Sequence, residues 1–187
     1  MKITAGDYKF RNIEIPRNVR PTTEKVREAI CSMIRDRIPD AVVLDLFAGS
    51  GSMGLELLSI GAGKCYFNEV NRQNFRILQS NINNCNAGEK AVLSNKDYLT
   101  CISGISETLD IVFMDPPYSQ IEYYEKTMEM LQEKSLLDEG SVVIAEHLYD
   151  NELSECYGNL VRIKAKKYGT IGVDIFILEE DTDEESV

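Results

Sequence analysis

The stretch Ala41-Val-Val-Leu-Asp-Leu-Phe-Ala-Gly-Ser-Gly-Ser-Met-Gly54 decides the fold of this 187-residue chain. Its apolar run, residues 41–46, predicts a buried β-strand, and residues 54–60 continue as a helix. Between the two, Gly49-Ser-Gly-Ser-Met-Gly54 has the spacing G-x-G-x-x-G. Glycines here allow a tight turn and let a ligand approach the backbone, while N–H groups of the helix start point toward that ligand. The stretch therefore predicts a ligand-binding turn between a strand and a helix.

Glu69 follows Gly49 by about twenty residues and ends the next apolar run, residues 64–69. An acid at this place in a β-α-β unit accepts hydrogen bonds from the hydroxyls of a ribose. The glycine turn and Glu69 together predict a cofactor that contains a nucleoside. They do not by themselves distinguish a dinucleotide from S-adenosylmethionine.

Short apolar runs alternate with amphipathic stretches along the rest of the chain, a pattern that is typical of β-α-β units around a parallel sheet. The predicted strands are 41–46, 64–69, 91–93, 109–114, 141–146, 161–167 and 172–178. The predicted helices are 54–60, 71–83, 97–104 and 123–134. The last two strands have no room for a long crossover between them, so they should form an antiparallel hairpin. The sequence therefore predicts an α/β protein with a doubly wound, seven-stranded, mostly parallel sheet.

The two ends of the chain differ from this body, so three parts are expected. Residues 1–38 predict a short polar β-hairpin over 3–15 and a helix from Thr22 or Thr23 to Arg37, which either threonine can cap. Residues 39–178 form the α/β domain. Residues 179–187, with six acids, read as a disordered acidic tail.

Composition excludes several classes of protein. The five cysteines are scattered without a C-x-x-C pair, and His147 is the only histidine, so neither a disulfide framework, a zinc site nor a Ser-His-Asp triad is indicated. From that pattern we expect no metal. No segment resembles a signal peptide or a membrane span, so we expect a cytoplasmic protein. The net charge of −11 argues against nucleic acid, but residues 1–37 carry +4 and the remainder −15. The basic segment is compatible with either phosphate binding or an ordinary solvated surface.

Asp115-Pro-Pro-Tyr118 follows the predicted strand 109–114, where open α/β sheets place their ligands. The two prolines fix the backbone and leave carbonyl oxygens free as acceptors. An aromatic amino group is a poor nucleophile, because its lone pair is delocalised into the ring. The Asp115 carboxylate and the Pro116 carbonyl can accept hydrogen bonds from both N–H groups of such an amino group as charge develops on its nitrogen. Tyr118 can stack on the base. This motif indicates methylation of a base amino group and favours S-adenosylmethionine as the cofactor.

These motifs together resemble the class I S-adenosylmethionine-dependent methyltransferases. More closely, the chain resembles the RsmD family of bacterial guanine-N2 methyltransferases, which act on small-subunit (16S) ribosomal RNA. The resemblance runs from Met1 to about Leu178. It is carried by Arg20-Pro-Thr-Thr23, Val26-Arg-Glu-Ala29, Val43-Leu-Asp-Leu-Phe-Ala-Gly-Ser-Gly51, Gly54-Leu-Glu56, Asp115-Pro-Pro-Tyr118 and Lys167-Tyr-Gly169.

The resemblance implies an antiparallel last strand and a set of site residues. It implies catalytic roles for Asp115, Pro116 and Tyr118. The cofactor-binding residues that we expect are Thr22, Arg27, Asp45, Phe47, Gly49, Ser50, Gly51, Glu69, Asp97 and Tyr98. The RNA-binding residues that we expect are Lys9, Arg11, Arg20 and Lys167. The implied partner is ribosomal RNA, within a small ribosomal subunit or its precursor, and we expect a monomer.

Three other classes of function stay open at this point, the first of them a methyltransferase with another substrate. Adenine in DNA and the glutamine amide of a protein carry amino groups that the same acceptors serve, although the chain has no recognition domain for a DNA sequence. An NAD-dependent oxidoreductase would use the glycine turn and Glu69, but Asp115-Pro-Pro-Tyr118 has no role in hydride transfer. A non-catalytic RNA-binding domain is disfavoured by the intact Asp115 and glycine turn.

Overall fold

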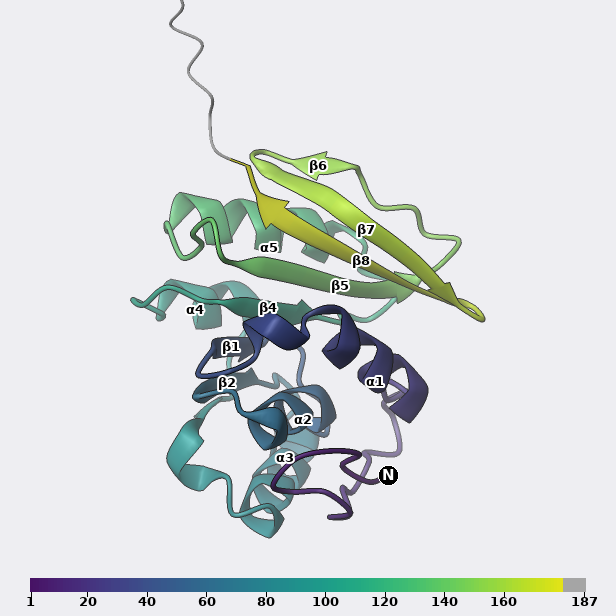
Figure 1. Cartoon of the computed structure of the whole chain (residues 1–187), viewed down its shortest axis with the longest axis vertical. Coiled ribbons are helices and arrows are strands. Elements are labelled where there is room, and N and C mark those ends of the chain that lie inside the picture. Colours follow the sequence, from purple (N-terminus) through teal and green to yellow (C-terminus); the bar gives the residue numbers. More distant parts are fainter. Residues whose placement is uncertain (180–187) are drawn as a thin grey trace, which may run out of the picture.

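The computed structural model describes residues 1–179, which contain one sheet of eight strands with helices on both of its faces (Figure 1). The strands are β1 (Val42–Asp45), β2 (Lys64–Asn68), β3 (Ala91–Ser94), β4 (Ile111–Met114), β5 (Val142–Leu148), β6 (Cys156–Tyr157), β7 (Leu160–Tyr168) and β8 (Ile171–Leu178). The helices are α1 (Glu24–Met33), α2 (Ser52–Ile60), α3 (Arg72–Asn84), α4 (Tyr98–Ser103) and α5 (Glu122–Glu133), with 3₁₀ turns at Arg35–Arg37 and Gly88–Lys90.

The strand order, β3-β2-β1-β4-β5-β8-β7-β6, positions the site. Strands β1 to β5 pair in parallel, and β8 runs antiparallel to both β5 and β7. The connections change direction between β1 and β4, and open α/β sheets bind ligands outside the carboxyl ends of the strands at such a point. The fold therefore places a ligand crevice where the glycine turn and the Asp115 loop begin.

Alternation along the strands supplies the core on both faces of the sheet. Val43, Ile111 and Ile144 pack against α1, α2 and α3 on one face. Their neighbours Leu44 and Val112 pack against α4 and α5 on the other. Successive strand side chains point to opposite faces, so runs that are apolar at every position are what a doubly covered sheet requires.

The predicted sheet is confirmed, including the antiparallel last strand. Every predicted strand is present within a few residues of its expected bounds, and β6 is one strand more than the sequence indicated. β6 has only two residues, Cys156 and Tyr157, and a segment of that length has no periodicity to detect.

The N-terminal segment differs from the regular β-hairpin that was expected over residues 3–15. It forms a looped turn that is closed by an isolated bridge between Lys2 and Asn12. The backbone N–H groups of Thr4 and Ala5 donate to the side chain of Glu56 on α2 instead of to a partner strand. Because Ile3 and Ile13 belong to the same hydrophobic cluster as the sheet, this segment packs on the α/β body.

The first helix starts where the sequence indicated, with the Thr23 side chain accepting from the Val26 N–H at 3.3 Å. It ends earlier, at Met33, and a 3₁₀ turn over Arg35–Arg37 replaces the last predicted turn. Most of the predicted acidic tail, residues 180–187, lies outside the described residues. Among residues 1–179, none of the helices combines the length and the apolar character that crossing a bilayer demands.

Candidate active site

A cavity of about 560 Å³ opens at the carboxyl ends of β1, β2 and β4. It brings together most of the residues that the sequence singled out. Its lining includes Arg20, Thr22, Asp45, Phe47, Gly49, Ser50, Glu69, Asp97, Tyr98, Asp115, Pro116 and Tyr118. Motifs spread over about a hundred residues of sequence therefore share one site.

The glycine turn forms one side of this cavity. Gly49 and Gly51 have φ angles of +55° and +80°, a left-handed conformation that glycine adopts without steric strain. A Cβ on Gly54 would lie 2.3 Å from a ring carbon of Phe67, so this glycine lets α2 pack closely on β2. Gly51 does not line the cavity; it begins α2 behind the turn, and a Cβ there would meet Leu78 at 2.4 Å. Its contribution is to the shape of the turn.

Asp45 ends β1 beneath the turn and lines the cavity. Its Oδ2 atom accepts from the Gly54 N–H at 3.0 Å, which ties the strand to the first turn of α2. Burial raises the pKa of Asp45 to about 7; the bond from Gly54 opposes the shift, and the charge of Glu69 adds to it. Asp45 therefore changes its charge near neutral pH unless a bound cation favours the ionised form.

Glu69 follows β2 and is 9% exposed. Its two oxygens accept from the backbone N–H groups of Gly49 at 3.0 Å and Asn71 at 2.8 Å. Burial raises the pKa of Glu69, and these two hydrogen bonds oppose the shift. Because each carboxylate oxygen has a second lone pair, Glu69 can still accept from ligand hydroxyls.

Aromatic rings form another wall of the cavity. The rings of Tyr98 and Tyr123 stack with their centroids 4.3 Å apart, and the Phe47 ring lies 5.6 Å from Tyr98. Beside them, Asp97 caps α4 by accepting from the Leu99 N–H at 3.0 Å. A planar, apolar heterocycle fits against these rings, with the Asp97 carboxylate beside it as an acceptor.

The Asp115 loop also lines the cavity, after the strand β4 that pairs with β1. Burial raises the pKa of Asp115 well above its usual range, as do the charges of Glu146 and Asp45, while Arg20 opposes the shift. The pKa of Tyr118 is raised to about 12, first by burial and then by the charges of Asp115 and Glu146. The phenol of Tyr118 is therefore neutral at physiological pH and presents an uncharged ring.

Arg20 and Thr22 reach the cavity because the segment before α1 forms part of its wall. Asn81 on α3 holds this segment to the glycine turn: its amide group donates to the carbonyls of both Glu14 and Ser50, each at 2.8 Å. Arg20, which the sequence placed among the RNA contacts, thus lies within electrostatic reach of Asp115.

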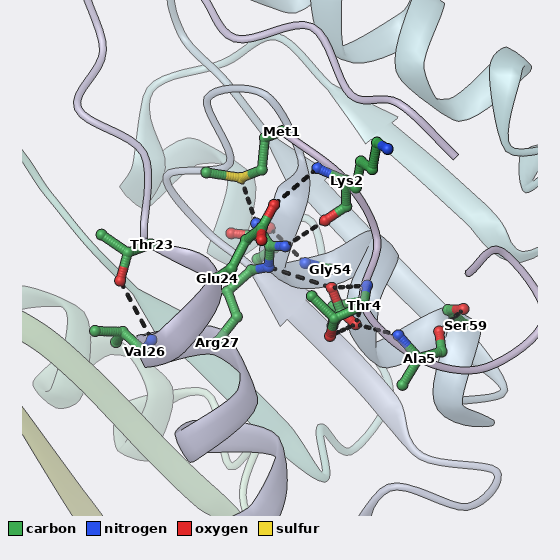
Figure 2. Close-up of polar contacts among 12 residues, drawn as sticks. Met1, Lys2, Thr4, Ala5, Thr23, Glu24, Val26, Arg27, Gly54 and Ser59 are labelled. Carbon is green, nitrogen blue, oxygen red and sulfur yellow. Dashed lines mark hydrogen bonds and ion pairs between the residues drawn. The ribbon is translucent and has the colours of Figure 1, made fainter. Parts of the chain in front are cut away.

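Arg27 does not line the cavity. Its side chain is completely buried, and its Nε atom lies 3.2 Å from Oε2 of Glu56. Its Nη2 atom donates to the Lys2 carbonyl at 2.6 Å, and Figure 2 shows the side chain pointing from α1 toward Met1 and Lys2. The structure thus places Arg27, predicted to bind cofactor, in the packing of the N-terminal segment.

The remaining predicted RNA contacts lie outside the cavity. Arg11 donates to the Asn84 carbonyl at the end of α3, and Lys9 lies 5.0 Å above the exposed Phe10 ring. Lys167 lies 3.9 Å above the ring of Tyr149. Tyr149 is hydrogen-bonded through its backbone to Thr170 in the β7–β8 turn. These positions are surface positions, as phosphate contacts require.

The sequence interpretation missed Tyr123 in the cavity wall and Glu146 beside the cavity. Tyr123, the first-turn aromatic of α5, stacks in the cavity wall, and a tyrosine in a helix carries no sequence signal for such a role. Glu146 is buried next to Asp115, and a signal for it existed. It ends the predicted strand 141–146, so it lies at the same edge of the sheet as Asp115.

Comparison with known proteins agrees with this geometry. The model of the family described as "Conserved hypothetical protein 95" matches residues 1–177. The "Putative rRNA methyltransferase YlbH" of Bacillus subtilis is 30% identical over 94% of this chain and 98% of its own length. The "Ribosomal RNA small subunit methyltransferase D" of Escherichia coli K12 is 29% identical over 94% and 89%. The solved "Putative methyltransferase yhhF" of Escherichia coli superimposes with a TM-score of 0.85, at 27% identity over 96% of this chain and 98% of that one.

The fold and the site define a class I methyltransferase. The chain belongs to the family described as Conserved hypothetical protein 95, and the resemblance seen in the sequence is thereby confirmed.

Proposed function

We propose that this protein transfers a methyl group from S-adenosylmethionine to the N2 amino group of guanine in small-subunit ribosomal RNA. The observation that carries the proposal is the Asp115-Pro-Pro-Tyr118 loop, which lines the same cavity as the glycine turn. Relatives that match nearly the whole chain are named as ribosomal RNA methyltransferases, which supports the substrate class.

The cavity fits S-adenosylmethionine in size and in chemistry. Glu69 would accept from the ribose hydroxyls, the rings of Tyr98 and Tyr123 would cover the adenine, and the backbone at Gly49 would lie beside the methionine part. When bound, the cofactor supplies an electrophilic methyl group on a positively charged sulfur. Carboxylates at Asp45, Glu69 and Asp115 line the cavity and favour a cation.

The chain's own part in catalysis is to hold and activate the target base. The Asp115 carboxylate and the Pro116 carbonyl accept hydrogen bonds from the two N–H groups of the amino group, which favours the tetrahedral form of the nitrogen as positive charge develops. The methylated nitrogen then loses one proton, which the Asp115 carboxylate can take up because its pKa is raised. Tyr118, a neutral ring in the cavity lining, stacks on the base. No covalent enzyme intermediate is needed for this transfer.

Methyl transfer from labelled S-adenosylmethionine to total RNA, DNA and protein of a strain lacking this gene tests the proposal. The label should appear in RNA and, after digestion, in N2-methylguanosine of the small-subunit RNA. Label in DNA or protein, or in a different nucleoside of RNA, would contradict the proposed substrate. Offering naked RNA and small subunits in parallel shows which form of the RNA is methylated. The substrate that we propose is RNA within an assembled small subunit or its precursor. We further propose that the enzyme is a monomer that acts in the cytoplasm.

Cofactor affinity should depend on pH through Asp45. At pH 6, below the pKa of about 7, this carboxyl is mostly neutral, so it no longer favours a cation. S-adenosylmethionine should therefore bind up to about tenfold more weakly at pH 6 than at pH 8, as one pKa unit corresponds to a tenfold change. S-adenosylhomocysteine lacks the sulfonium charge and serves as the matched control ligand. Its affinity should change less between the two pH values. Calorimetry that finds the same pH dependence for both ligands would rule out this role of Asp45.

We propose that residues 1–38 dock the RNA, whereas the α/β body holds the cofactor. Replacing Lys9 and Arg11 with Ala should weaken RNA binding and flatten its salt dependence by about one to two units of slope, because each phosphate contact releases counterions. Cofactor affinity should not change. The double replacement of Lys126 on α5 and Lys134 directly after it with Ala removes the same charge elsewhere and should leave the slope unaltered. An equal slope for the Lys9 and Arg11 variant and the parent would move the docking surface to the loops around Tyr118 and Lys167.

A further inference from the structure

Asp115 directly follows β4, and Glu146 lies on the neighbouring parallel strand β5, two residues before its end. Met114 on β4 pairs with Ala145 on β5, so Asp115 and Glu146 are the next pair in register. Register partners in a parallel pair point to the same face of the sheet. The two carboxylates therefore lie side by side at the edge where the target base would bind, although only Asp115 lines the cavity.

Two hydrogen bonds fix Glu146 from opposite faces of the sheet. The hydroxyl of Thr22 donates to Glu146 Oε2 at 2.6 Å, and Thr22 itself lines the cavity. On the other face, the hydroxyl of Tyr124 donates to the Glu146 carbonyl at 2.6 Å. Glu146 is 3% exposed, so its side chain connects the cavity wall to the strand edge without reaching solvent.

Packing alone does not explain an ionisable side chain at this buried position. Burial raises the pKa of Glu146, while the bond from Thr22 and the charges of Arg20 and His147 oppose the shift. The charge of Glu146 in turn raises the pKa of Asp115. The other groups that act electrostatically in this cluster are Asp45, Tyr118 and Tyr124. A buried carboxylate without a salt bridge is destabilising, which points to a use beyond stability.

We propose that Glu146 is a positioning residue for methyl transfer: anchored by Thr22, it acts through its neighbour on β4 and sets the charge of the Asp115 carboxylate that accepts from the target amino group. The inference rests on the proposed function for its catalytic meaning. The coupling of the two carboxylates is independent of that function and can be measured in the free protein.

Replacing Glu146 with Gln tests the proposal, because Gln keeps an acceptor for Thr22 and removes the charge. Without that charge the pKa of Asp115 falls, so Asp115 is ionised at lower pH. The acidic limb of the pH–rate profile for single-turnover methyl transfer should move to lower pH by about one unit. A shift of this size is within the range that a neighbouring carboxylate produces. Glu146→Asp, which restores a charge, should return the limb toward the parent's position. Glu133→Gln on the exposed face of α5 is the control with the same chemical change, and its limb should stay in place.

A second measurement keeps the inference testable apart from activity. Carbon NMR of labelled aspartate side chains should show the Asp115 titration at lower pH in the Glu146→Gln variant, whether or not RNA is a substrate. Thr22→Val, which leaves Glu146 in place but removes its donor, should shift the Asp115 titration in the same direction by less. An Asp115 titration that is the same in the parent and in Glu146→Gln overturns the inference, as does a pH profile lowered uniformly without a shift. A parent enzyme that methylates no RNA would instead contradict the proposed function, with the NMR titration still deciding the role of Glu146.

Discussion

Asp115→Asn should lower the rate of methyl transfer by about a hundredfold or more. The variant keeps the size of the side chain but replaces one acceptor oxygen with an N–H donor, which meets the target N–H instead of accepting from it. The loss is comparable to that from removing one hydrogen-bonding group that acts only in a transition state. Asp115 is partly buried in the cavity lining, which strengthens the effect because a misplaced donor there is poorly compensated by water.

Single-turnover kinetics with saturating cofactor measure this rate, and calorimetry measures cofactor affinity separately. The affinity for S-adenosylhomocysteine should change far less than the rate, since the Asp115 contact is made to the base. Asp150→Asn, an isosteric change at an exposed position after β5, is the control and should leave the rate unchanged. An Asp115→Asn variant with the parent's single-turnover rate would show that the amino group is activated by another group.

Arg27→Met should lower the free energy of unfolding by about 3 kcal/mol, the effect expected when one partner of a buried ion pair is removed. Figure 2 shows how this side chain joins α1 to the N-terminal segment. Glu56 accepts from Arg27, from the Thr4 N–H at 2.9 Å and from the Ala5 N–H at 3.1 Å. Met fills a similar volume, but it leaves the Glu56 carboxylate buried without its cation.

Urea denaturation measures the change, and Lys25→Met is the matched control on the exposed face of the same helix. The control should change the free energy of unfolding by no more than about 0.5 kcal/mol, as is usual for surface positions. The two roles considered for Arg27 give opposite results. A variant of unchanged stability that binds S-adenosylmethionine more weakly would return Arg27 to the cofactor site.

Local patterns in the sequence determined most of the fold and the centre of the site. Runs that are apolar at every position predicted the strands, because a sheet covered on both faces buries both sets of side chains. The G-x-G-x-x-G spacing and the Asp115-Pro-Pro-Tyr118 motif located both sides of the cavity, since each follows a strand and parallel strands end at one edge. These features depend on residues close in sequence, and proximity in sequence is enough to specify them.

The tertiary structure alone decided which partner each polar side chain has. Arg27 follows the cavity-lining Thr22 by five residues, yet its guanidinium group pairs with Glu56, 29 residues away, in the protein interior. Glu146 becomes a neighbour of Asp115 only through the register of β4 with β5, and Thr22 meets it from 124 residues away. In the N-terminal segment, the backbone N–H groups of Thr4 and Ala5 donate to the side chain of Glu56 on α2. Such contacts follow from packing geometry across the whole chain. The end of the predicted strand 141–146 indicated the sheet edge on which Glu146 lies, but a pattern of neighbouring residues does not name the partner of each side chain.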